Sequence, residues 1–213
     1  MSLILSGDTG VPVTTVTGTL PVANGGSGVT TSTGTGAVVL GTSPSISGAV
    51  LSTMASSVIT SGTAVASTSG TSIDFTGIPS WVKRITVMFN GVSTVGAAST
   101  NLIQLGTSGG IEITGYISAS SVTSTTSASQ SAVTGFAIYS GGSADYIIGA
   151  FTIHQLSTSP NLWVLSGTGT VSTGYTMTAA GNKTLSGVLD RIRLTTVNGT
   201  NTFDAGSINI LYE

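Results

Sequence analysis

Short segments in the second part of the chain alternate between apolar and polar residues. Residues 84–90 read RITVMFN, which places Ile85, Val87 and Phe89 on one face at the two-residue period of a half-buried β-strand. Similar alternation marks residues 145–156, 191–197 and 207–213. Further strand candidates, bounded by turn residues, are 72–76, 102–107, 111–118, 133–139, 162–171 and 175–185. The pattern predicts ten short strands.

The spacing of these strands predicts an all-β domain. Many follow one another at intervals of about 8–14 residues, and no segment carries a helical stripe of normal length. Residues 198–206, NGTNTFDAG, are rich in turn-forming residues, and residues 140–143, SGGS, predict a hairpin turn between Tyr139 and Asp145. We expect an antiparallel β-sandwich or a jelly-roll-like fold.

The first part of the chain has a different composition. No charged residue lies between Asp8 and Asp74, and the first aromatic residue is Phe75, so all 12 aromatic residues fall in the last 139 positions. Because aromatic side chains each bury a large area, the second part can build a core of its own. We therefore divide the chain into an extended N-terminal segment, residues 1–61, and a C-terminal β-domain, residues 62–213.

The N-terminal segment is almost uncharged, rich in Val and Thr, and interrupted by glycine. Its helix propensity is low, yet it lacks the low hydrophobicity and high net charge of disordered chains. Exposed on a monomer, such a segment would tend to aggregate. We therefore expect extended chain and short strands that neighbouring subunits cover, with a flexible tether as the alternative.

The polar residues of the chain are mostly uncharged. Ser and Thr make up 70 of the 213 residues, whereas charged residues make up 6%, and the net charge is −2. With no basic patch, the chain is not expected to bind nucleic acid. It has no cysteine for disulfides or thiolate metal sites, and no run of about 18 apolar residues that would insert into a membrane. The first residues carry no basic region, so we expect no signal peptide.

The sequence contains no pattern typical of a catalytic, cofactor or metal site. The GGSG at residues 25–28 lacks the Gly-Lys-Ser/Thr of a phosphate loop. His154 is the single histidine, so a cluster of histidine ligands is excluded and a structural or interface role is expected. The carboxylates of the second part show no evident catalytic pair, and Asp190 beside Arg191 is interpreted as an ion pair. We expect no catalytic residue, no cofactor and no metal ligand.

Aromatic side chains are the remaining candidates for binding. We expect Tyr116, Trp163 and Tyr175 on the surface, where they could stack against sugars. The alternative is that they pack in the core or in a subunit interface. Trp81, two residues after Pro79, is expected in the core.

The segment LPVANGGSGVTT, residues 20–31, resembles the LPVANGGTGATT motif of tail fibres of tailed bacteriophages. Residues 35–44 are similar to the sequence that follows the motif in such fibres. The second part is similar to a C-terminal domain that recurs in these proteins, at residues 75–93, 108–116 and 205–213. The resemblance covers most of the chain.

This resemblance implies an intertwined homotrimeric virion protein of the phage tail fibre that binds the host cell surface during adsorption. Other tail or baseplate proteins would bind the N-terminal segment, where Asn24, Gly25, Gly26 and Gly28 would allow turns or close contacts between the three chains. The β-domain would bind a host-surface glycan or protein. Two alternatives stay open: a structural baseplate or capsid decoration fibre without receptor binding, and a glycan-degrading tailspike.

Overall fold

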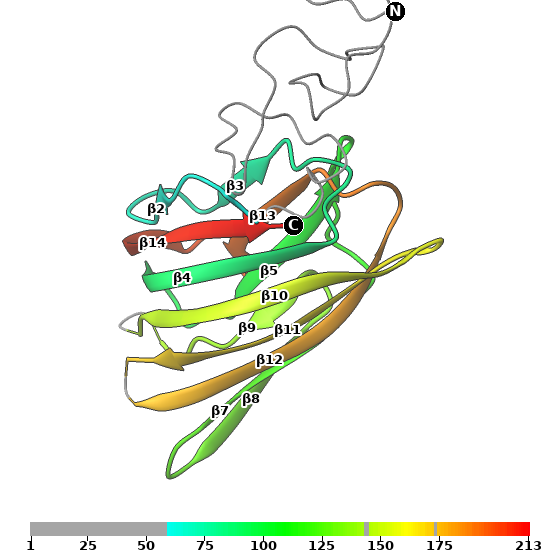
Figure 1. Ribbon diagram of the computed structural model, residues 1–213. Coiled ribbons are helices and arrows are strands. Elements are labelled where there is room, and N and C mark those ends of the chain that lie inside the picture. The colour runs from blue at the N-terminus through cyan, green and yellow to red at the C-terminus, as the bar shows by residue number, and fades with distance from the viewer. Residues whose placement is uncertain (1–58, 143–144, 173) are drawn as a thin grey trace, which may run out of the picture. The chain divides into compact units, whose positions relative to one another are not determined.

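The computed structural model describes residues 59–142, 145–172 and 174–213, which form two antiparallel β-sheets (Figure 1). All regular secondary structure in these residues is strand. The predicted all-β, antiparallel class is therefore confirmed. Most of the predicted N-terminal segment, residues 1–58, lies outside the described residues.

The larger sheet has nine strands in the order β1-β14-β4-β10-β11-β12-β7-β8, and β2 also pairs with β14. Strands β4, β10, β11 and β12 cross the molecule as long neighbouring ribbons in Figure 1. The bounds are β1 Thr60–Ser61, β2 Val65–Ala66, β4 Arg84–Val95, β7 Tyr116–Thr123, β8 Ser127–Ala132, β10 Ile147–Thr158, β11 Asn161–Val171, β12 Tyr175–Leu185 and β14 Thr202–Tyr212.

The smaller sheet has five strands in the order β3-β13-β5-β6, and β9 also pairs with β5. The bounds are β3 Ile73–Thr76, β5 Asn101–Thr107, β6 Gly110–Ile111, β9 Phe136–Ile138 and β13 Arg191–Thr196. The chain crosses between the two sheets several times, because strands that follow one another in sequence, such as β4 and β5, belong to different sheets.

The core contains side chains from both sheets. In β4, Ile85, Val87 and Phe89 are all buried, as their two-residue period predicts. Phe89 meets Phe151 of β10 edge to face, with ring centroids 5.5 Å apart. Ile192 of β13 is fully buried in the same cluster, so the inner faces of the two sheets close on one another as in a β-sandwich.

The predicted strand 111–118 is wrong in its middle. β6 ends at Ile111 and β7 begins at Tyr116, with no strand between them. Glu112 lies outside both strands and forms an ion pair with Lys183. Gly115 has a φ of 76°, a backbone conformation that glycine adopts readily and that is not that of a strand. Two local requirements that hydrophobic periodicity does not record therefore interrupt the strand.

The sequence predicts a hairpin turn at residues 140–143, and the pairing of the two flanking strands shows that this is also wrong; Ser143 itself lies outside the described residues. A hairpin joins two strands that pair with each other, but β9 pairs with β5 in the smaller sheet and β10 pairs with β4 and β11 in the larger one. The β9–β10 connection instead takes the chain from one sheet to the other. This crossing contributes side chains to the site described below.

Several strand segments were not predicted, among them β1, β2, β8 and the first residues of β14. β8 reads SASQSA, a mostly exposed edge strand whose sequence has no apolar alternation. β14 begins at Thr202, inside the predicted turn region 198–206, and bulges interrupt its pairing with β4 near Ala205. Irregular or edge pairing leaves little trace in the hydrophobic pattern.

Candidate functional site

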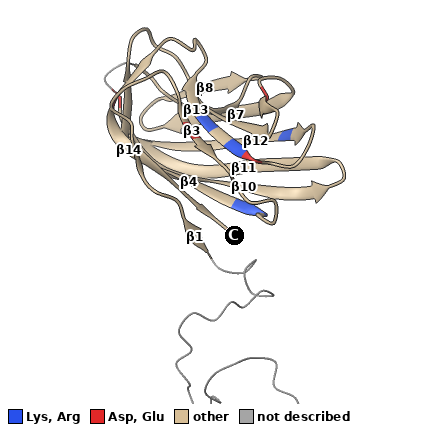
Figure 2. Ribbon diagram, turned by 90° about the horizontal axis from the view of Figure 1, so that it is seen from above, with Lys and Arg blue, Asp and Glu red and all other residues tan. Residues whose placement is uncertain are grey.

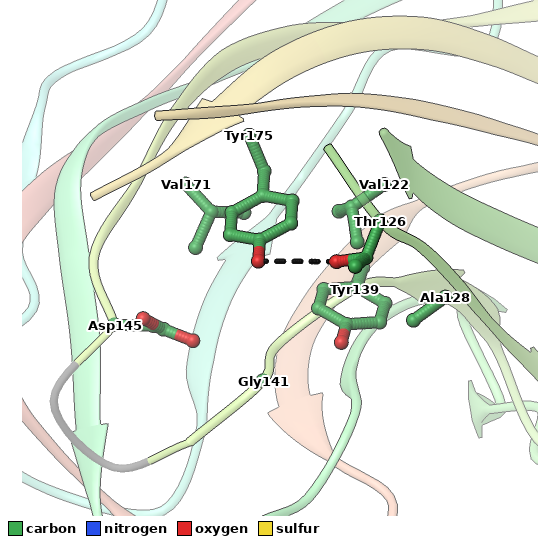
Figure 3. A pocket seen from close by; sticks show the side chains of 8 residues that line it. All are labelled: Val122, Thr126, Ala128, Tyr139, Gly141, Asp145, Val171 and Tyr175. Carbon is green, nitrogen blue, oxygen red and sulfur yellow. Dashed lines mark hydrogen bonds between the residues drawn. The ribbon is translucent and has the colours of Figure 1, made fainter. Parts of the chain in front are cut away.

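A cleft of about 260 Å³ opens beside the ends of four strands of the larger sheet (Figure 3). The β9–β10 connection, which comes from the smaller sheet, forms one of its walls. The lining residues are Val122 on β7, Thr126 in the β7–β8 turn, Ala128 on β8, Tyr139, Gly141 and Asp145 in the β9–β10 connection, Val171 on β11 and Tyr175 on β12.

Strand register explains why distant parts of the chain meet at this cleft. The end of β7 lies beside the start of β12, where Thr123 pairs with Thr176. The start of β12 lies beside the end of β11, where Tyr175 pairs with Val171. Val171 also pairs with Ile147 at the start of β10. Four strand ends therefore share one edge of the sandwich.

The base of the cleft is apolar and its rim is polar. Val122 and Val171 are almost fully buried, and the half-buried rings of Tyr139 and Tyr175 pack against the core. The Tyr175 hydroxyl lies 3.4 Å from the Thr126 Oγ1, so the two form a hydrogen bond in which either can donate. Figure 3 shows this bond between β12 and the β7–β8 turn, with the Tyr139 ring beside it.

Asp145 brings a carboxylate to this rim. Its Oδ1 accepts a hydrogen bond of 3.2 Å from the Ser172 hydroxyl. Its Oδ2 lies against Gly141, where an added Cβ would come within 2.6 Å of it, so glycine makes room for the carboxylate. In the part of the chain that the structure describes, Asp145 forms no ion pair.

The cations of the chain are all engaged elsewhere. Charged residues occupy only a few short stretches of the ribbon in Figure 2. The partners of the five Lys and Arg residues are Gln155 for Lys83, Glu213 for Arg84, Glu112 for Lys183, Asp190 for Arg191 and Asp74 for Arg193. The pairing of Asp190 with Arg191 confirms the prediction from sequence. None of the five cations lines the cleft, so the charge of Asp145 is not neutralised there.

The three aromatic residues predicted on the surface have different environments. Tyr175 lines the cleft and is half-buried. The surface prediction is wrong for Tyr116 and Trp163, whose exposed fractions are 2% and 1%. Trp163 faces the interior from β11, two residues from buried Leu165 on the same face. Trp81, predicted in the core, packs against the core while staying half-buried.

Tyr116 is part of a buried polar cluster beneath the start of β7. Its hydroxyl accepts a hydrogen bond of 2.7 Å from the Leu105 amide and contacts the Glu112 carbonyl oxygen, while its ring packs edge to face on Phe136. Burial raises the pKa of the Tyr116 hydroxyl well above its usual range, so the group stays neutral. Its role in the structure is therefore internal.

An ion pair closes this cluster. Lys183 is only 4% exposed. Its Nζ lies 2.6 Å from Oε2 of Glu112 and 5.4 Å from the centre of the Tyr116 ring. The other oxygen of Glu112 accepts hydrogen bonds from the amide and hydroxyl of Ser186. Burial raises the pKa of Glu112, but the hydrogen bonds from Lys183 and Ser186 outweigh it, so the net pKa is lowered. The pair holds the irregular segment before β7 in place.

Of the polar and aromatic residues that line the cleft, Thr126, Tyr139 and Asp145 were not among the candidates that the sequence favours. Tyr139 and Asp145 flank the glycine pair of the β9–β10 connection, a signal that points to a site only once this connection is known to cross between sheets. Thr126 belongs to a Ser/Thr-rich stretch in which no single hydroxyl stands out.

The other candidate residues belong to the N-terminal region. Asn24, Gly25, Gly26 and Gly28, predicted to form turns where chains meet, lie outside the described residues.

Comparisons with protein-family models, curated proteins and solved structures gave no match to this chain.

The described residues contain no group of three or more His, Cys, Asp or Glu side chains that could hold a metal ion. The same residues include no helix long and apolar enough to cross a membrane.

Proposed function

We propose that this chain is a bacteriophage tail fibre protein that binds the surface of the host cell during adsorption. The observation that carries the proposal is the cleft, in which two half-buried tyrosines, a threonine hydroxyl and an unneutralised carboxylate surround an apolar base. Sites that recognise small polar molecules combine an apolar lining with a few placed polar groups in this way.

The sequence adds the second line of support. The segment 20–31 resembles a motif of phage tail fibres, and residues 75–93, 108–116 and 205–213 resemble their C-terminal domain. The last three segments overlap β3 and β4, β6 and β7, and β14 respectively. On this reading the protein belongs to the virion, with the sandwich available to the host and the N-terminal segment bound to other tail or baseplate proteins.

Binding without hydrolysis fits the cleft better than a glycosidase does. Most glycosidases hold two carboxylates about 5–10 Å apart on either side of the scissile bond. Asp145 is the single carboxylate among the residues that line the cleft. Three other carboxylates form ion pairs away from the cleft: Glu112 with Lys183, Asp74 with Arg193 and Asp190 with Arg191.

We also propose a homotrimer, because a single small cleft binds weakly. Three copies on one particle raise the overall affinity without any new contact, since the second and third binding events become intramolecular. The nearly uncharged N-terminal segment supports this assembly, because neighbouring chains would cover its apolar residues. Sedimentation of the full-length protein should give about three times the chain mass of 21.0 kDa. A stable monomer would contradict the trimer.

Adsorption to bacterial cells tests the proposed function. Fluorescently labelled full-length protein should bind cells of some strains in a diverse bacterial panel, and Tyr175→Ala should reduce that binding by about tenfold or more. Tyr146→Ala is the matched control, because Tyr146 is 45% exposed and lies outside the cleft. If the wild-type protein binds no strain but labels purified phage particles, the decoration fibre without a receptor becomes the better description.

A further inference from the structure

The size of the cleft limits its ligand to about one ring. Clefts that hold drug-sized molecules measure roughly 300–1,000 Å³, and this one, at about 260 Å³, falls just below that range. A long peptide or an oligosaccharide could place only one residue inside it. The ligand is therefore a single cyclic unit, alone or at the end of a chain.

The lining determines the chemistry of that unit. Val122, Val171 and the tyrosine rings offer apolar contact, whereas the hydroxyls of Thr126 and Tyr175 and the carboxylate of Asp145 offer hydrogen bonds. A pyranose matches both halves, because its C–H groups form an apolar face and its hydroxyls surround the ring. A purely apolar ligand would leave the Asp145 carboxylate desolvated without a donor, which is costly.

Charge decides between classes of pyranose. Asp145 carries the one charge among the lining residues, and its carboxylate accepts a hydrogen bond from Ser172. The five Lys and Arg residues of the chain have partners elsewhere. A hydroxyl group can donate to this carboxylate. The carboxylate of a uronic acid, or the phosphate group of a sugar phosphate, would lie a few ångströms from the Asp145 carboxylate with no cation beside them. The resulting repulsion would give the cleft specificity against such acidic ligands.

We propose that this cleft binds a single pyranose residue that carries no acidic group, and that it discriminates against acidic sugars through Asp145. The inference rests on the proposed function for the source of the sugar, a glycan of the host surface. The binding itself concerns only the cleft and is measured without cells.

The test uses pairs of methyl glycosides that differ only at C6. The methyl glycosides of glucose, galactose and mannose are each compared with the corresponding uronic acid, by saturation-transfer NMR and titration with the full-length protein. At least one neutral glycoside should bind in the millimolar range and at least about tenfold more tightly than its uronic acid. The repulsion of two like charges about 5 Å apart weakens binding by roughly fourfold in bulk water and by roughly a few hundredfold at the effective dielectric constant near a protein surface. The discrimination should shrink in high salt.

Variants assign the effect to individual residues. Asp145→Asn keeps an acceptor for Ser172 and should bring the neutral and acidic sugars within about threefold of each other. The matched control is Asp204→Asn, which removes another carboxylate that pairs with a serine, Ser93, but does not line the cleft. It should leave the tenfold preference unchanged. Tyr175→Ala should abolish binding of the neutral sugar, and Tyr146→Ala should not.

Several results would overturn the inference. One is that no neutral glycoside binds, and another is that the acidic and neutral members of each pair bind equally well to the wild-type protein. A third is that Asp145→Asn leaves the preference intact. If cells adsorb the protein and Tyr175→Ala has no effect on either assay, the cleft inference fails while host binding survives through another surface. If the glycosides bind but no bacterial strain does, the proposed function fails and the cleft inference stands.

Discussion

Replacing Lys183 by Met should destabilise the sandwich by about 2–3 kcal/mol at neutral pH. Lys183 is only 4% exposed, and its loss leaves the Glu112 carboxylate without its cation. Removing one partner of a fully buried pair costs about 3–5 kcal/mol. The Glu112 side chain is 20% exposed and keeps its two hydrogen bonds from Ser186, so the cost should fall below that range. Methionine is an unbranched side chain of similar length that carries no charge.

Denaturant titration followed by tryptophan fluorescence measures this change, because Trp81 and Trp163 both lie in the sandwich. The control is the double variant Glu112→Gln with Lys183→Met, in which no charge is left stranded. It should be more stable than the sum of the two single changes predicts, by about 1 kcal/mol or more, because the residues are in direct contact. Additive effects of the two substitutions would refute the role of the ion pair.

The pH dependence gives a second check on the same pair. The pKa of Glu112 is lowered in the folded state from its ordinary value of 4.5, so the unfolded chain binds more protons between the folded value and 4.5. Stability therefore rises with pH in this window: the contribution of Glu112 is fully present above about pH 4.5 and is lost as pH falls through the folded pKa. The difference in unfolding free energy between wild type and Lys183→Met should shrink as pH falls. An equal difference at roughly pH 3 and pH 7 would contradict the reasoning.

Two further substitutions test the packing of the sandwich, each by denaturant titration. Phe151→Ala should cost about 3–5 kcal/mol, because the side chain is fully buried against Phe89; a cost below about 1 kcal/mol would show that the site collapses freely. Gly206→Ala should cost about 2 kcal/mol or more, because Gly206 has a φ of 90° and an added Cβ would collide with the backbone of Gly91. Gly142→Ala, where an added Cβ meets nothing within 4 Å, is the control and should change stability by less than about 0.5 kcal/mol.

The parts of the fold that were predicted from sequence are those in which one strand face is buried and the other is not. β4 shows this directly, since Ile85, Val87 and Phe89 are buried in the core while Thr86 and Met88, which alternate with them, are only half-buried. In such a strand the apolar residues recur at every second position, so its burial can be predicted from the sequence. The same reasoning found β12 with its bounds intact, Tyr175–Leu185.

The failures have a different physical origin. β8 exposes both its edge and most of its side chains, so selection for a core leaves no pattern in it. Trp163 and Tyr116 were placed on the surface because nothing local distinguishes an aromatic residue on the inner face of a strand from one on the outer face. The decisive information is which neighbouring positions are buried, and that depends on the other sheet.

The cleft could not be predicted, because it is a product of register. Its wall residues come from four strand ends and two connections spread over more than 50 positions of sequence, from Val122 to Tyr175. Each pairing must be known before Tyr139 and Tyr175 can be placed near each other. Of the two, the sequence singled out Tyr175 as a surface candidate, and the structure places that residue in the cleft.

Because charged residues are scarce, Asp145 has a large influence on the electrostatic field at the cleft. In an average domain about a quarter of the residues are charged, and an acidic ligand near one carboxylate would meet several cations within a Debye length of about 8 Å. Here only 6% of residues are charged, and each of the five cations already has a partner. The field at the cleft therefore depends on very few groups, and Asp145 is the one that lines it. Hence a single neutral substitution at this position should alter the sugar preference, whereas in a highly charged surface the same change would be diluted by its neighbours.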